Sequence, residues 1–329
     1  MILLWGLLED DTFRSVHDRV RRRHVKLAFV NHASIGRTRL EFDSLPEPHY
    51  RLSCGDKSYE LNEMSAAYLR PYDHRLYAEP GSRTAKVEPP DVVHHLLMSW
   101  AEHATGVIIN RPSAEATNQS KLYQAMAIER SGLQVPESLV SNDMEEIESF
   151  AARHGRVIYK SMSSVRSIVR ELDVRSLGAL GAIGPALFQQ RIIGRNVRVH
   201  VVGDATVACG IESDATDYRY GMARMALCEL PSDVAQKCAT LTRELGLELS
   251  GIDLMVTADD QYYCLEVNPS PAFSVFDVAS NGTIAELVAE RLTAMAAVPP
   301  LTMGSVVSPT DPVRRPHFAS ERTPSRSQG

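Results

Sequence analysis

The chain has 329 residues, of which 44% are hydrophobic and 23% are charged, and its formal net charge is −6. This length and composition are typical of a soluble globular protein with two or three domains. The acidic balance argues against sequence-independent binding of nucleic acids, which requires a basic surface.

The apolar first eight residues make neither a signal sequence nor a membrane span. They have no basic start, are too short to cross a bilayer and run directly into acidic residues, so a buried first strand is the better interpretation. Five scattered cysteines form no Cys-x-x-Cys pair and have no histidines at zinc spacing: Cys54, Cys209, Cys228, Cys238 and Cys264. Such a set is typical of the reducing cytosol. We expect a cytoplasmic protein that does not bind membranes.

Residues 1–105 are predicted to form a separate α/β domain. A strand at 2–7 is followed by a helix at 12–23, which Asp11 or Thr12 can cap. The helix has apolar residues every three to four positions, as expected of a helix that packs on a sheet. A second strand (26–31), three short strands (39–43, 50–54 and 57–61) and a helix (92–103) complete the domain. The basic run at 19–24 is either an exposed helix face or a surface for an acidic peptide.

Residues 106–298 are predicted to hold further strands and helices. A strand at 107–110 is followed by a helix at 118–131 that ends at Gly132, a helix at 144–154 and a strand at 157–160. Strands at 187–192, 196–202, 207–212, 251–256 and 262–267 come next, with a helix at 233–245. Thr283 and Glu286 have the spacing of a capping box that opens a last helix. Residues 299–329 have few large apolar side chains and are predicted to be a disordered tail.

Oxygen-bearing side chains gather on the last predicted hairpin. Alternation along the second strand places Cys264, Glu266 and Asn268 on one face, and Asp253 on the first strand can approach Glu266. Carboxylate and amide oxygens are the ligands that Mg²⁺ prefers. The sequence therefore predicts a magnesium site, although a solvated strand end would show the same residues.

Five segments in order resemble the ATP-grasp ligases, and most closely the branch that adds amino acids to the carboxylates of peptides or proteins. These are Asn110 to Lys121, whose lysine lies just inside a helix, Val157-Ile-Tyr-Lys160, Leu187 to Gly203, Gly251-Ile-Asp-Leu, and Cys264-Leu-Glu-Val-Asn-Pro-Ser-Pro271. The resemblance covers residues 107–297. It implies an α/β (α+β) ATP-grasp fold, in which an N-terminal Rossmann-like pre-grasp domain (1–105) precedes two α+β subdomains that clamp ATP (106–185 and 186–298).

The resemblance also implies a nucleotide site. Lys121 and Lys160 would hold the α- and β-phosphates as point charges. The backbone of Gln189, Gln190, Arg191 and Ile192 would bind the adenine edge. Asn196 would bind the ribose hydroxyls, and two Mg²⁺ ions, for which Mn²⁺ can substitute, would bind at Asp253, Glu266 and Asn268.

Three arginines are candidates for the anionic transition state. Arg198 lies on the polar face of a strand whose other face is valine, Arg219 resembles a family arginine that meets the transferring phosphoryl group, and Arg166 lies in a serine-rich loop that could cover the phosphates. His200, on the same face as Arg198, is either a proton acceptor for an amine or a packed, hydrogen-bonded histidine.

The implied reaction is ATP-dependent amide formation from a carboxylate and an amine through an acyl phosphate. The two substrates are amino acids or peptides, and a homo-oligomer is compatible with the resemblance. Three alternatives stay open: a ribosomal-peptide macrocyclase or maturase of the same fold, a non-catalytic ATP-binding module, and a small-molecule kinase.

Overall fold

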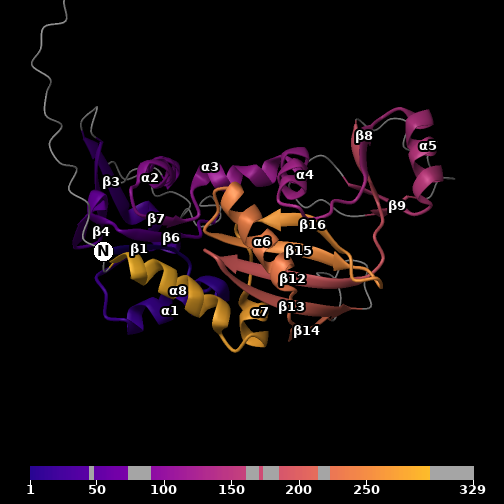
Figure 1. The fold of residues 1–329 in the computed structure, drawn as a ribbon. Coiled ribbons are helices and arrows are strands. Elements are labelled where there is room, and N and C mark those ends of the chain that lie inside the picture. The colour runs from indigo at the N-terminus through magenta and orange to yellow at the C-terminus, as the bar shows by residue number, and fades with distance from the viewer. Residues whose placement is uncertain (44–47, 73–89, 161–169, 173–184, 214–222, 297–329) are drawn as a thin grey trace, which may run out of the picture. The chain divides into compact units, whose positions relative to one another are not determined.

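The computed structural model describes residues 1–43, 48–72, 90–160, 170–172, 185–213 and 223–296. The start of the chain forms a parallel sheet with the strand order β2-β1-β6-β7 (Figure 1). Its strands are β1 (Ile2–Gly6), β2 (Leu27–Asn31), β6 (Ala66–Leu69) and β7 (Val107–Ile109). All of β1 is buried, as expected where both faces of a parallel sheet are covered.

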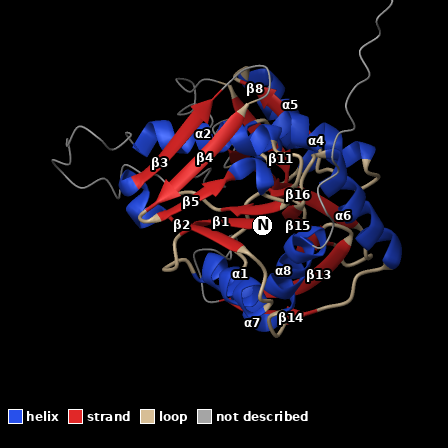
Figure 2. Ribbon diagram, turned by 90° about the vertical axis from the view of Figure 1, so that its left-hand side faces the viewer, coloured by secondary structure: helices blue, strands red, loops and turns tan. Residues whose placement is uncertain are grey.

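Different elements cover the two faces of this sheet. On one face lie α1 (Asp11–Arg22), α7 (Ser274–Ala279) and α8 (Thr283–Ala296), which Figure 2 shows on the same side of the strands. On the other lie α2 (Pro90–His103) and an antiparallel sheet of β3 (Thr38–Asp43), β4 (His49–Cys54) and β5 (Lys57–Glu60). The C-terminal helix α8 therefore completes the core of the N-terminal sheet.

The predicted N-cap of α1 is wrong by one residue. Asp10, rather than Asp11 or Thr12, has the extended backbone of a cap, and its carboxylate accepts hydrogen bonds from the backbone N–H groups of Thr12 and Phe13. The same carboxylate pairs with Arg70 at the end of β6. This distant partner fixes which of the adjacent acidic residues caps the helix.

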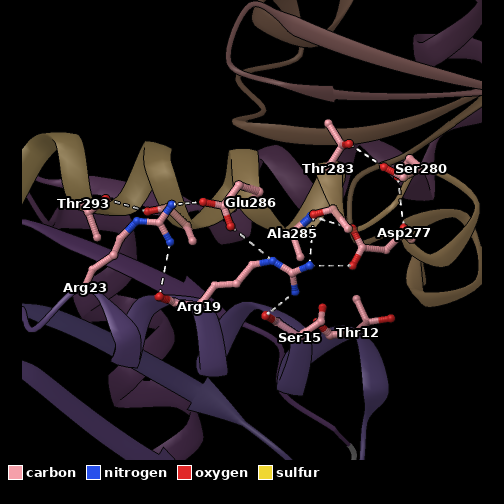
Figure 3. Close-up of polar contacts among 12 residues, drawn as sticks. Thr12, Ser15, Arg19, Arg23, Asp277, Ser280, Thr283, Ala285, Glu286 and Thr293 are labelled. Carbon is pink, nitrogen blue, oxygen red and sulfur yellow. Dashed lines mark hydrogen bonds and ion pairs between the residues drawn. The ribbon is translucent and has the colours of Figure 1, made fainter.

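The predicted capping box of α8 is also wrong. The Thr283 hydroxyl donates to the carbonyl of Ser280, and the Glu286 carboxylate faces α1 (Figure 3). The cap is instead Asp277 of α7, whose Oδ1 accepts from the backbone N–H of Ala285 at 2.9 Å. The local sequence pattern therefore has the right spacing, but a carboxylate outside the helix satisfies its first turn.

Arginines from the basic run of α1 pair with acidic residues of α7 and α8 (Figure 3). Arg19 lies 3.3 Å from Glu286 and 3.6 Å from Asp277, and it donates to the carbonyl of Gly282 at 3.1 Å. Arg23 pairs with the other oxygen of Glu286. Part of the basic run is thus an internal seam between α1 and the helices α7 and α8.

A second antiparallel sheet has the strand order β10-β9-β11-β8, and α5 (Met144–His154) packs on it. Its strands are β8 (Ser138–Ser141), β9 (Val157–Lys160), β10 (Arg170–Glu171) and β11 (Ala186–Gln190). Between β7 and this sheet run α3 (Pro112–Glu115), a 3-10 helix (Ala116–Gln119) and α4 (Lys121–Arg130). The α-helix begins at Lys121 rather than at 118, because the Ser120 hydroxyl caps it by accepting from the N–H of Tyr123.

The largest sheet is antiparallel and has the strand order β14-β13-β12-β15-β16. Its strands are β12 (Arg195–Val202), β13 (Ala205–Ser213), β14 (Ala223–Leu227), β15 (Leu249–Val256) and β16 (Tyr262–Asn268). Helices α4 and α6 (Ser232–Glu244) cover one face, where Val197, Val199 and Val201 of β12 are buried. The opposite face packs on α7 and α8 along β13 and is polar along β12, β15 and β16.

Residues Met1–Val298 form one compact unit, and the predicted tail at 299–329 lies outside the described residues. The boundaries predicted inside this unit, after residues 105 and 185, stay a prediction. In the described part of the chain, no helix has both the length and the apolar character that a membrane crossing requires.

Candidate active site

The polar face of β12, β15 and β16 brings charged residues into direct register. Asp253 on β15 pairs with Arg198 on one side and with Glu266 on the other. The Arg198 guanidinium Nη1 lies 2.6 Å from Asp253 Oδ2, and the side chains of Arg198 and Asp253 are 6% and 17% exposed. This cation–carboxylate pair therefore lies within the sheet surface, largely shielded from water.

The three predicted metal ligands converge beside this pair. The Asn268 amide Nδ2 lies 3.4 Å from Asp253 Oδ2 and 3.5 Å from Glu266 Oε1. Among the described residues no three His, Cys, Asp or Glu side chains gather at one point, so a third protein ligand would be the amide oxygen of Asn268, presented by rotation of the amide. Two carboxylates and a carboxamide form a hard-oxygen set that fits Mg²⁺.

The prediction that Cys264 shares this face is wrong. The register shifts within the β15–β16 ladder, so that Asp253 pairs with Glu266 while the next residue, Leu254, pairs with Cys264. Leu265 is the extra residue of a β-bulge, which reverses the alternation. Cys264 therefore points into the core beside Leu254 and is 1% exposed.

Gly251 makes room for the Arg198 side chain. It lies on β15 two residues before Asp253, on the same face. A Cβ at this position would lie 2.4 Å from Arg198 Nη2 and 2.8 Å from the Cβ of Pro271. Glycine is needed here for space, because the guanidinium crosses directly over the backbone.

Of the two predicted phosphate lysines, Lys121 lies near both Lys160 and the Glu266 carboxylate. Lys121 is the first residue of α4, and Lys160, at the end of β9, is buried. Burial and the nearby charge of Lys160 lower the pKa of the Lys121 amine, and Glu266 partly offsets this by raising it. Two cations held close enough to disfavour each other's charge form a natural site for a polyanion.

Residues 117–273 match the family model of the ATP-grasp domain. The chain contains an ATP-grasp domain. The predicted α/β fold with an ATP-grasp domain is thereby confirmed, as is the resemblance from which it was inferred, and the division into a pre-grasp domain and two subdomains stays a prediction.

Several proteins that are similar to this chain in sequence or fold are ligases or synthases. β-Citrylglutamate synthase B of Mus musculus is 26% identical over 235 residues, which span 64% of this chain and 60% of that protein. The structure of the ATP-grasp ligase PsnB with a phosphomimetic variant of its minimal precursor, Mg and ADP has a TM-score of 0.72 and 25% identity, over 90% of this chain and 98% of PsnB. The macrocyclase MdnC of Microcystis aeruginosa, bound with its precursor peptide MdnA, has a TM-score of 0.75 and 20% identity, over 89% of this chain and 100% of MdnC.

In the ATP-grasp domain, the predicted adenine hinge lies at the C-terminal end of β11 and just after it. Gln189 is buried and its Nε2 donates to the Ser138 hydroxyl at 3.2 Å. The backbone N–H groups of Gln190 and Arg191 donate to the carbonyls of Glu137 and Arg156. Two of the four predicted hinge residues therefore already use their amides within the fold.

The other predicted residues of the ATP-grasp domain have different outcomes. Asn196 is half-buried on β12, one row beyond Arg198 on the polar face. Arg166 and Arg219 lie outside the described residues.

His200 is a packed residue of the domain. It is 0% exposed, and its ring centroid lies 5.0 Å from that of Phe276 and 6.1 Å from that of Phe273. Burial, and then the charge of Arg198, lower the pKa of His200 well below its usual value, so the ring is neutral. Within the described residues neither ring nitrogen has a hydrogen-bond partner, so the packed histidine was correctly predicted but its hydrogen bond was not.

Two buried side-chain amides next to the ligands were missed from the sequence. Asn110, directly after β7, accepts from the N–H groups of Glu248 and Leu249 and donates to the carbonyls of Leu249 and Pro269. Gln124 of α4 bonds to Val267, between Glu266 and Asn268. Gln124 lies three residues after Lys121, on the helix face that also buries Ala127 and Ile128. A polar residue on this otherwise apolar face was the one signal in the sequence that could have indicated its role.

Proposed function

We propose that the chain is an ATP-dependent carboxylate–amine ligase. The observation that supports this most strongly is the convergence of Asp253, Glu266 and Asn268 on one point of the sheet, with Lys121 close enough to Glu266 for their charges to interact. Such a site offers anionic ligands to metal ions and cationic side chains to phosphates. This combination suits a nucleoside triphosphate bound with Mg²⁺.

Each group has a separate part in the proposal. Asp253, Glu266 and Asn268 would hold one or two Mg²⁺ ions, or Mn²⁺ in their place, which neutralise the charge of the terminal phosphates. Lys121 and Lys160 would hold the α- and β-phosphates. The backbone at Ile192 would bind the adenine, since the amides of Gln190 and Arg191 are used in the sheet, and Asn196 would bind the ribose.

The chemistry needs placement and charge neutralisation rather than a nucleophilic side chain. An oxygen of the substrate carboxylate attacks the γ-phosphorus of ATP, and the bond to the β-phosphate oxygen breaks, which gives an acyl phosphate and ADP. The amine then attacks the acyl carbon, loses a proton and expels inorganic phosphate. Arg198, Arg219 and Arg166 are the proposed cations for the phosphoryl group, because an arginine fork matches its oxygens.

We further propose that the carboxylate belongs to a peptide. PsnB, which is similar along almost its whole length, is known in complex with its precursor, with Mg and with ADP. The rival substrate is a free amino acid or small acid, which the likeness to β-citrylglutamate synthase B favours. This second match spans only 60% of the relative's length, so we prefer the peptide.

Release of ADP by the purified protein with ATP and Mg²⁺ tests both proposals. Turnover that needs a carboxylate and an amine would support the ligase, and the pool that gives it, peptides or free acids, would identify the substrate class. ADP release without any amine would indicate a kinase, whereas binding of ATP without turnover under any pool would favour a non-catalytic module.

The Glu266→Ala variant shows whether this turnover depends on the proposed site. We expect the variant to fold and to lose ADP release, while the matched change at an exposed glutamate of α8, Glu290→Ala, has no effect. Unchanged turnover in Glu266→Ala would remove the proposed metal site.

A further inference from the structure

The ligand-bearing strand β16 lies at the edge of its sheet, so among the described residues one side of its backbone has no neighbouring strand, and only an isolated bridge joins it to Gln134. Unpaired N–H and C=O groups at a buried edge are costly and need other partners. Two residues supply them. The N–H of Cys264 donates to the carbonyl of Gln134 at 2.8 Å, and both backbone groups of Val267 bond to the side chain of Gln124. The bulge that contains Glu266 is therefore held at both of its ends.

The Gln124 side chain takes the place of a missing strand at Val267. Its Nε2 donates to the carbonyl of Val267 at 2.8 Å, and its Oε1 accepts from the Val267 N–H at 3.3 Å. A carboxamide can do this because it carries one donor and one acceptor in the same plane, as a peptide group does. Gln124 is 5% exposed, so water does not compete for these bonds.

The same helix carries the first phosphate lysine. Lys121 and Gln124 are three residues apart on α4 and hence on neighbouring positions of one helix face, and α4 lies along β16 (Figure 1). Val267 lies between Glu266 and Asn268, whose side chains point to the opposite side of the sheet from the Val267 side chain. Bonds to the Val267 backbone thus fix the position of both ligands relative to Lys121.

We propose that Gln124 is a positioning residue, which sets the metal ligands Glu266 and Asn268 at the distance from Lys121 that the bound nucleotide requires. This inference rests on the proposed function. Loss of the two bonds would leave all ligands and both lysines present but would release the strand that carries the ligands. The expected result is a weaker metal site, and not merely a less stable protein.

The test is the Mg²⁺ concentration that gives half-maximal ADP release, measured with the full chain. Gln124→Met keeps the length of the side chain and removes both hydrogen bonds, and we expect the required Mg²⁺ concentration to rise about tenfold or more, as is usual when a residue that supports a metal ligand is lost. The matched control is Gln134→Met beside the same strand edge. Among the described residues the Gln134 side chain bonds only to the exposed Gln261, and its backbone bond to Cys264 is unaffected. An unchanged Mg²⁺ requirement in Gln124→Met would overturn the inference.

A second variant decides the question if Gln124→Met does not fold. In Gln124→Glu, the protonated carboxyl can donate to the Val267 carbonyl, whereas the ionised carboxylate repels it. We expect a Mg²⁺ requirement close to that of the wild type at low pH and a steep rise as the introduced carboxyl loses its proton. If the Mg²⁺ requirement of Gln124→Glu changes with pH in the same way as that of the wild type, the inference is contradicted.

The wild type separates this inference from the proposed function. If the wild type releases no ADP with any substrate pool, the proposed activity fails. The positioning role is then tested through binding, as the increase in melting temperature that Mg²⁺ and ADP produce in the wild type and in both Gln124 variants. A Mg²⁺-dependent increase that is equal in all three proteins would overturn it.

Discussion

Arg198 and Asp253 are direct partners across the β12–β15 ladder, joined by an ion pair of 2.6 Å. Because Asp253 also pairs with Glu266, the guanidinium offsets one of two adjacent carboxylates before any metal binds. A buried charge that loses its partner is strongly unfavourable. Arg198 therefore has a structural task at Asp253 in addition to its proposed contact with phosphate.

The Arg198→Met variant tests this task. We expect a loss of roughly 3 kcal/mol in the free energy of unfolding, since the Asp253 carboxylate stays partly buried without its cation. Urea unfolding measures the loss. In the double variant Arg198→Met/Asp253→Asn, the loss should be smaller than the sum of the single losses, and additive values would show that the pair is not coupled.

Substitution of Gly251 should disturb the same pair by a steric route. A methyl group in Gly251→Ala would overlap with Arg198 and Pro271, and overpacking of this kind costs about 1–3 kcal/mol. We expect lower ADP release together with a lower melting temperature. Gly210→Ala on β13 is the control, because its nearest neighbour would lie at 4.0 Å, and equal effects of the two changes would contradict the steric explanation.

Stability should fall on the acidic side because of His200. Burial lowers the pKa of His200 in the folded protein below its usual value of 6.5, so the unfolded chain binds a proton that the folded chain does not. The contribution of neutral His200 to the free energy of unfolding is thus complete above pH 6.5. Below pH 6.5 it decreases by up to about 1.4 kcal/mol per pH unit. Unfolding curves recorded across this pH range should show a shallower acid limb for His200→Leu, and an identical limb would exclude His200 as its source.

Glu115 should have the opposite pH dependence. Burial, partly offset by the charge of Arg70, raises the pKa of this half-buried carboxyl from 4.5 to about 7. The folded state then holds a proton that the unfolded state releases, so stability is full below pH 4.5 and is lost as the pH rises through 7. At pH 8 we expect the free energy of unfolding of Glu115→Gln to exceed that of the wild type by up to about 3 kcal/mol, and at pH 4 we expect no difference. Equal stability of the two proteins at pH 8 would contradict the raised pKa.

The sequence was sufficient for the parts of the site that depend on local alternation. The strand pattern and the short hairpin bring Asp253 opposite Glu266 without any knowledge of the rest of the fold. The prediction failed two residues before Glu266, at Cys264, because a single bulge reverses the faces and leaves no mark in the residue types. The predicted cap of α8 was wrong for a related reason, because the capping residue Asp277 lies outside the Thr283–Glu286 spacing on which the prediction was based.

Contacts between distant segments could not be predicted. Gln124 and Val267 are 143 residues apart, and Asn110 and Leu249 are 139 residues apart. Both amides replace backbone partners at places where a strand or a loop lacks them, and this need becomes visible only once the sheet order is known. The approach of Lys121 to Lys160 and Glu266 likewise depends on tertiary packing, since α4 packs on β16 and Lys160 belongs to another sheet.

The packing of α8 on the N-terminal sheet has a consequence for protein synthesis. The apolar side of β1 and α1 is closed by a helix that begins at Thr283, about 260 residues after α1 ends. At a usual translation rate the ribosome needs on the order of 13–50 seconds to make that stretch. During this time the nascent N-terminal segment lacks the partner that shields Phe13, Val16 and Val20, which makes it a natural client for a chaperone until the last helix emerges.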